Sequence, residues 1–174
     1  MTGPMPVPLS PMARFIACDP DLCVGCQLCE FACAAVKDAG ADILKSRIRV
    51  VRHEPSVMVS IACRGCAEPA CVRVCPQEGA LAVNPDTHLI DVDNTICDGC
   101  GWCIDACPFG VALFDRDAGR AVICDLCAER DAGAACVEIC PKDALEIASP
   151  AMVADKANGG AVRSLLEELD AGRG

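Results

Sequence analysis

The sequence has few aromatic residues, few histidines and no long apolar run. Its 174 residues include one Trp, four Phe, two His and no Tyr. Large aromatic side chains usually fill much of a small core, so this chain needs another source of stability. No apolar run reaches the roughly 18 to 20 residues that cross a bilayer, which predicts that no segment spans a membrane. Residues 1–13 have no charged n-region, no apolar h-region and no twin arginine, so we expect a cytoplasmic protein without an export signal.

Basic residues are also in short supply. Lys and Arg number 15 against 25 Asp and Glu, which gives a formal net charge of -10. Nucleic acids and anionic lipid surfaces are therefore excluded as expected partners, and a partner with a basic face is favoured, although solubility alone explains the charge equally well. The sequence also has no glycine-rich nucleotide fingerprint and no Ser-His-Asp candidate. We therefore expect that the chain itself is not an enzyme.

Cysteine is the residue that the sequence has in excess. The 17 cysteines make up nearly a tenth of the chain, a density at which cysteine decides the architecture. They could form disulfides in a secreted scaffold or bind metal in a reducing compartment. Because no export signal is found, we favour metal binding.

Sixteen of the cysteines fall into four runs. The third run, residues 97–108, reads C-x2-C-x2-C-x3-C-P, which is the spacing of bacterial [4Fe-4S] sites. The first run (23–33) has the same spacing without the proline, while the second (63–76) and the fourth (124–141) have longer internal loops. Three closely spaced thiolates suit one cluster, and the fourth ligates the other cluster where two runs are paired. The sequence thus predicts four [4Fe-4S] clusters with sixteen cysteine ligands.

Zinc is the chemical alternative, because two C-x2-C pairs also form a tetrahedral site. The compact cysteine triplets of the first and third runs suit a face of an iron-sulfur cubane better. Cys18 fits no run, and we interpret it as a small buried thiol beside a cluster, with a redox or ligand role as the alternative.

Several residues near the cysteines carry further expectations. Gly25, Gly65 and Gly99 lie inside the triplets, where a backbone that wraps a cluster closely needs a positive φ. Trp102 lies between two cysteines of the third run and is expected to shield a cluster from solvent. The two histidines, His53 and His88, are expected on surface turns.

Short alternating stretches separate the runs and make the chain a fourfold repeat. Hairpins are predicted at residues 47–61, at 81–92 and at 111–123, and a helix at 30–37 that ends at Gly40. Residues 1–14 contain several prolines and are predicted to form an extended arm. In the tail at 150–174, apolar residues at helical spacing predict an amphipathic helix: Val162, Leu165, Leu166 and Leu169.

From Cys18 to Ile147, the ordered series of four runs closely resembles the four-cluster electron-transfer subunits of the dimethyl sulfoxide reductase type. Related small subunits serve formate dehydrogenases, hydrogenases, carbon monoxide dehydrogenases and tungsten aldehyde oxidoreductases. The resemblance implies an α+β fold of two nested bacterial ferredoxin-like modules, with short hairpins and short helices around four [4Fe-4S] clusters. The outer module would comprise residues 15–46 and 111–149, and the inner module residues 47–110.

The same resemblance implies that the first run shares its clusters with the fourth, and the second with the third. The four implied ligand sets are Cys23, Cys26, Cys29 and Cys140 (set 1); Cys33, Cys124, Cys127 and Cys136 (set 2); Cys63, Cys66, Cys71 and Cys107 (set 3); and Cys75, Cys97, Cys100 and Cys103 (set 4).

The function that the resemblance implies is non-catalytic electron transfer, one electron at a time, between a catalytic redox subunit and an acceptor or donor. A tungsten aldehyde oxidoreductase is the leading specific partner. The alternatives are a hydrogenase-, formate dehydrogenase- or carbon monoxide dehydrogenase-linked subunit, a free polyferredoxin and, more remotely, a zinc-binding interaction module. The arm and the tail helix could dock on other chains, with a loose arm and packing of the helix on the chain's own core as the alternatives. Self-association is a further expectation.

Overall fold

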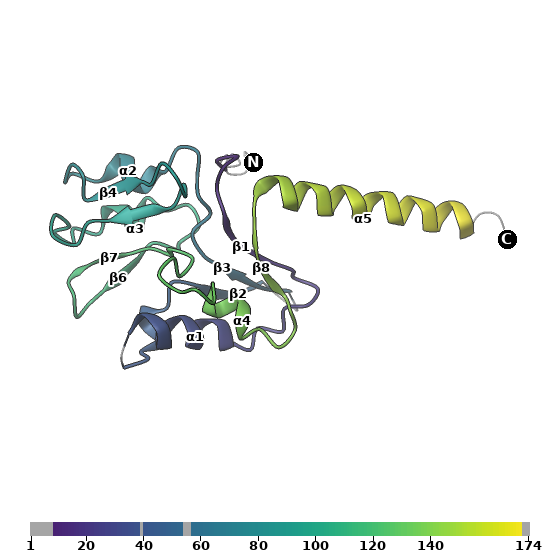
Figure 1. Cartoon of the computed structure of the whole chain (residues 1–174), viewed down its shortest axis with the longest axis horizontal. Coiled ribbons are helices and arrows are strands. Elements are labelled where there is room, and N and C mark those ends of the chain that lie inside the picture. Colours follow the sequence, from purple (N-terminus) through teal and green to yellow (C-terminus); the bar gives the residue numbers. More distant parts are fainter. Residues whose placement is uncertain (1–8, 39, 54–56, 172–174) are drawn as a thin grey trace.

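The computed structural model describes residues 9–38, 40–53 and 57–171. In this part of the chain, short helices alternate with four two-stranded antiparallel sheets, as the α+β prediction requires. Figure 1 shows these elements gathered into one body from which a single long helix extends.

Three of the sheets are hairpins between consecutive strands. They are β2 (Arg49–His53) with β3 (Val57–Ile61), β4 (Leu81–Val83) with β5 (Ile90–Val92), and β6 (Leu113–Asp115) with β7 (Arg120–Val122). All three lie within two residues of their predicted positions, because alternating apolar residues and local turn residues specify a hairpin without distant contacts.

The fourth sheet joins the two ends of the repeat. Strand β1 (Phe15–Cys18) pairs with β8 (Leu145–Ala148), so that Phe15 faces Ala148 and Cys18 faces Leu145. Phe15 and Ile16 are fully buried by this pairing. The first run follows β1 and the fourth run precedes β8, so this sheet brings these two runs together.

The short helices each carry one or two of the cysteines and pack in matching pairs. Helix α1 (Leu28–Lys37) packs against α4 (Ala135–Glu138), and α2 (Ala70–Val74) packs against α3 (Trp102–Asp105). A 3-10 turn, η1 (Ile43–Lys45), follows α1. Helix α1 ends at Lys37, the last residue of the predicted helix, because Asp38 adopts an extended conformation directly after it.

Two hydrophobic clusters form the core, and both contain cysteines. One combines Ile16, Ile48 and Leu145 with cysteines of the first and fourth runs. The other combines Leu81 and Ile90 with Cys103 and with residues of the β6–β7 hairpin. The chain therefore packs its few large apolar residues around the sites where the cysteines converge.

The two ends of the chain differ in their contacts. Leu9 forms a β-bridge with Cys66, and the Ser10 amide donates to the Gly65 carbonyl at 3.0 Å, so the described end of the arm lies across the second run. The arm's residues 1–8 lie outside the described residues. Helix α5 (Pro150–Ala171) projects away from the body, with Val162 and Leu166 exposed (Figure 1). In the described part of the chain, no helix combines the length and apolar character that a membrane crossing needs.

Candidate iron-sulfur centres

A cavity beside the first run is lined by all four cysteines of set 1. Cys23, Cys26 and Cys29 come from the loop before α1 and from its first turn, and Cys140 comes from the fourth run. Apolar side chains such as Val24, Leu28, Val50 and Leu145 complete the wall. The β1–β8 pairing explains why a cysteine more than a hundred residues away reaches this cavity.

A second cavity is lined by the four cysteines of set 3. The second run contributes Cys63, Cys66 and Cys71, and the third run contributes Cys107. The rest of the wall is again largely apolar. Packing of α2 against α3 brings the two runs together here.

The remaining cysteines gather in two further groups. Burial is the main cause that raises the pKa of Cys136, and the nearby charges of Cys33 and Cys127 raise this pKa further. Cys124 is affected in the same way, by burial first and then by Cys136 and Cys33, and these four are the members of set 2. Burial is also the main cause that raises the pKa of Cys103, and the charges of Cys100, Cys97 and Cys75 raise it further. These three cysteines are the other members of set 4.

Burial raises the pKa of many of these thiols. Burial first, and then the charges of neighbouring cysteines, raise the pKa of Cys71 and Cys136 to about 12. A thiol with such a pKa keeps its proton at neutral pH, whereas a bound metal cation displaces it. Four sulfur donors around a largely apolar cavity are the donors that iron-sulfur clusters use, so the cysteines present fit this group.

The groups of cysteines follow one another through the molecule. The charge of Cys29, a member of set 1, acts on Cys136, and the charge of Cys63 acts on Cys124. Sets 3 and 4 meet where helices α2 and α3 pack together. Helix α2 carries Cys71 of set 3 and is followed by Cys75 of set 4. Helix α3 carries Cys103 of set 4 and is followed by Cys107 of set 3. Of the 17 cysteines, only Cys26 and Cys100 are exposed, and they belong to the first and last groups of this series.

The cysteine loops have the left-handed backbone that their glycines predict. The φ angles of Gly25, Gly65 and Gly99 are 65°, 59° and 74°. Gly99 is also packed tightly, because a Cβ there would overlap the carbonyl oxygen of Gly119. The fourth run has no glycine at the matching position, and its Leu126 adopts a φ of 54° instead.

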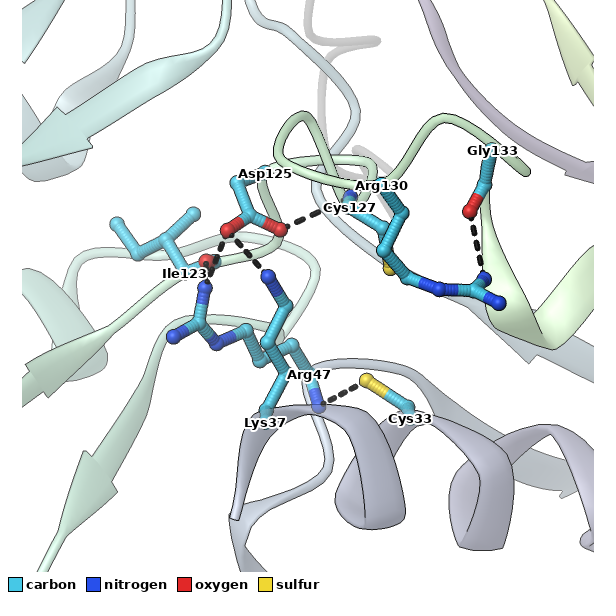
Figure 2. A network of polar contacts seen from close by, with 8 residues as sticks. All are labelled: Cys33, Lys37, Arg47, Ile123, Asp125, Cys127, Arg130 and Gly133. Atoms are coloured by element: carbon cyan, nitrogen blue, oxygen red, sulfur yellow. Dashed lines mark hydrogen bonds and ion pairs between the residues drawn. The ribbon is translucent and has the colours of Figure 1, made fainter.

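A polar network surrounds this fourth loop (Figure 2). The Asp125 carboxylate accepts hydrogen bonds from Lys37 Nζ at 2.7 Å, from Arg47 Nη1 at 2.8 Å and from the Cys127 amide at 3.0 Å. The Arg47 amide in turn donates to Cys33 Sγ at 3.3 Å. Burial raises the pKa of Asp125, but the Lys37 hydrogen bond and the two cationic charges outweigh it and hold the pKa below its usual value. The sequence prediction does not include this network, although a C-D-x-C pattern recurs in the third and fourth runs.

The polar surroundings of set 1 are different. Ser60 is buried, and its Oγ lies 3.5 Å from Cys29 Sγ and 3.9 Å from Cys23 Sγ. The Ser60 amide donates to Cys18 Sγ at 3.3 Å. Burial raises the pKa of Cys18 to about 11, so this half-buried cysteine outside the runs is a neutral thiol beside set 1.

Three further residues differ in part from expectation. Trp102 is 56% exposed at the start of α3, so it lies at the surface, and its role as a shield stays a prediction. His53 is exposed, but it lies in strand β2. The surface position expected for His88 is wrong, because His88 is half-buried and its Nδ1 lies 3.3 Å from Ser10 Oγ, on the arm that covers this region.

Comparison with known proteins gives a family match. The 4Fe-4S dicluster domain family matches residues 55–149, more than half of the chain. YsaA of Escherichia coli K12, which is named for electron transport, is 40% identical over 78% of this chain and 89% of its own length. The B subunit of the anaerobic dimethyl sulfoxide reductase of Haemophilus influenzae is 35% identical over 75% of this chain and 71% of its own. The thiosulfate reductase electron transfer subunit PhsB of Salmonella typhi is 34% identical over 74% of this chain and 71% of its own length.

Proposed function

Because this chain belongs to the 4Fe-4S dicluster domain family, we propose that it conducts electrons through four cysteine-bound clusters within a reductase complex. It is an iron-sulfur electron-transfer subunit of the dimethyl sulfoxide reductase type and is not itself catalytic. When bound, each [4Fe-4S] cluster supplies a centre that gains and loses one electron. The protein binds the clusters, excludes water from them and fixes their order.

We assign the ligands as sets 1 to 4. The observation that carries this assignment is the composition of the two cavities, each lined by three cysteines of one run and one cysteine of another. The neighbours of Cys136 and of Cys103 support sets 2 and 4. On this assignment, residues of the first and fourth runs hold two clusters, and residues of the second and third runs hold the other two, as nested modules require.

The order of the groups supports a linear relay from set 1 through sets 2 and 3 to set 4. We propose that electrons enter and leave beside the exposed Cys26 and Cys100, since these cysteines lie in the first and last sets. Exposed apolar side chains flank Cys26 in the sequence, including Val24, Leu28 and Phe31. Ile96 and Trp102 are likewise exposed beside Cys100. Exposed apolar groups of this kind favour permanent interfaces, so we propose that partner subunits contact both ends of the relay.

The catalytic partner that we propose first is a tungsten aldehyde oxidoreductase. The names of the relatives favour a second candidate, an oxidoreductase acting on dimethyl sulfoxide or thiosulfate. Purification of the native complex under anaerobic conditions, followed by mass measurement of its subunits, identifies the partner. A complex with a catalytic subunit of either kind would support the relay, whereas a chain that purifies alone would favour a free polyferredoxin.

Metal analysis tests the cofactor assignment on the same sample. We expect a brown protein with broad absorption near about 400 nm and about sixteen irons per chain, four for each cluster. A colourless protein that contains zinc would contradict the relay and support an interaction module.

A further inference from the structure

Ser60 is one of four buried polar residues in the described part of the chain, and its hydroxyl lies beside cysteines of set 1. It lies in β3, opposite Val50 of β2, and only 3% of it is exposed. Its backbone amide donates to Cys18 Sγ of the adjacent strand β1, which fixes the strand next to set 1. The hydroxyl then lies between two cysteines of that set, 3.5 Å from Cys29 Sγ and 3.9 Å from Cys23 Sγ.

The direction of the hydrogen bond follows from the chemistry of the ligands. A cysteine that binds iron has lost its proton, so its sulfur can only accept. The Ser60 hydroxyl is then the donor. Within the described part of the chain, Ser60 supplies the one side-chain hydroxyl that is hydrogen-bonded to a cysteine of any run.

We propose that Ser60 is a positioning residue that raises the reduction potential of the cluster held by set 1, by donating a hydrogen bond to Cys29 and more weakly to Cys23. The proposal rests on the electron-transfer function proposed above. Reduction adds negative charge to a cluster and its ligand sulfurs, and a donor that faces those sulfurs stabilises the reduced form more than the oxidised form. Ser60 thus makes set 1 a better electron acceptor than its apolar wall alone would allow.

The test is a potentiometric titration of the anaerobically purified, full-length protein, followed by electron paramagnetic resonance. Cys26→Ser identifies the signal of set 1 because it replaces an exposed ligand of that set. Ser60→Ala should lower the potential of this one signal, and Ser60→Thr, which keeps the hydroxyl, should restore it. Ser10→Ala is the matched control, because Ser10 is also buried but its hydroxyl faces His88 and not a sulfur.

An unchanged potential in Ser60→Ala would overturn the proposal, as would an equal shift in Ser60→Thr. If Ser60→Ala does not retain the cluster, the wild-type protein gives a second measurement. Exchange into D2O should shift the iron-sulfur stretching bands of set 1 in resonance Raman spectra, and bands that do not move would also overturn the proposal. Absence of all iron-sulfur signals from the wild-type protein would instead contradict the proposed function, so the two failures are distinguishable.

Discussion

The loops of the third and fourth runs use the same aspartate in two different settings. Asp98 and Asp125 each follow the first cysteine of their run, and each accepts a hydrogen bond from the amide two residues later, Cys100 at 3.1 Å and Cys127 at 3.0 Å. The residue between them is Gly99 in one loop and Leu126 in the other, and both have a positive φ. The third run thus uses a residue for which this conformation is free of strain, and the fourth does not.

The partners of the two aspartates differ accordingly. Asp98 Oδ2 accepts a hydrogen bond from the neutral Gln77 amide, whereas Asp125 Oδ2 accepts from Lys37 and Arg47. A left-handed Leu costs roughly 1 to 2 kcal/mol, and the two ion pairs offset that cost at Leu126. The left-handed residue two positions after the first cysteine is therefore a glycine in the third run and a leucine beside a charged network in the fourth, where Cys127 also has a positive φ.

Loss of the last cysteine of each run should have the largest effect. Cys107→Ser should disturb the cluster of set 3 and leave that of set 4, and Cys140→Ser should disturb set 1 and leave set 2. In each case the cluster affected is the one held by the partner run. Electron paramagnetic resonance of the reduced variants measures this. If only the signal of set 4 changed in Cys107→Ser, the crossed assignment would be wrong.

Gly99→Ala should be the next most disruptive change. The new Cβ would have to displace the Gly119 backbone oxygen, so we expect a loss of more than about 3 kcal/mol in the free energy of unfolding. Gly101→Ala is the control, because φ there is 82° but no atom beyond its neighbours in the chain lies within 4 Å of the added Cβ. Anaerobic denaturant unfolding compares the two variants. Equal losses in the free energy of unfolding would show that the strain of a positive φ, and not the contact with Gly119, causes the destabilisation.

Asp125→Asn should weaken the fourth loop moderately. Its side chain is 34% exposed, and solvent screening limits the expected loss to about 1 to 2 kcal/mol. Cys127 would then be held less firmly, so a chelator should remove iron from set 2 faster than from the other sets. Asp98→Asn is the control, and we expect it to release iron at the wild-type rate because its side-chain partner is neutral.

The pH dependence of the Asp125 effect has a defined sign. The pKa of Asp125 is below its usual value of about 3.9, so its ion pairs stabilise the fold fully above that pH and lose this contribution as the pH falls further. The difference in stability between the wild-type protein and Asp125→Asn should therefore be constant from about pH 5 to 7 and shrink below about pH 4. Chelator-induced iron release at several pH values measures it, and a difference that grew on acidification would contradict the assignment.

The smallest effect on stability is expected for Asp98→Asn. Removing a negative charge close to Cys100 should raise the reduction potential of the cluster in set 4, with little change in unfolding. Asp93→Asn makes the same charge change at another exposed turn, where the carboxylate accepts from Thr95, and should shift the potential less. Potentiometric titration compares the two variants, and equal shifts would mean that net charge alone matters.

The local parts of the structure could be predicted from the sequence. The hairpins and the left-handed glycines depend on neighbouring residues, and both lie where the sequence predicts them. The pairing of β1 with β8 could not be predicted, because nothing close to Phe15 or Leu145 indicates a partner so far along the chain. The left-handed Leu126 could not be predicted either, since Leu does not signal a positive φ.

The β1–β8 pairing has a consequence for biosynthesis. On the proposed assignment, sets 3 and 4 take no cysteine beyond Cys107, so all their ligands are synthesised before the fourth run, although their apolar wall is completed only by the β6–β7 hairpin. Sets 1 and 2 need cysteines of the fourth run, and β8 reaches β1 only after Ala148 has left the exit tunnel. On this assignment the ligand sets become complete from the middle of the chain outward, and the pairing of β8 with β1 brings the last of them together.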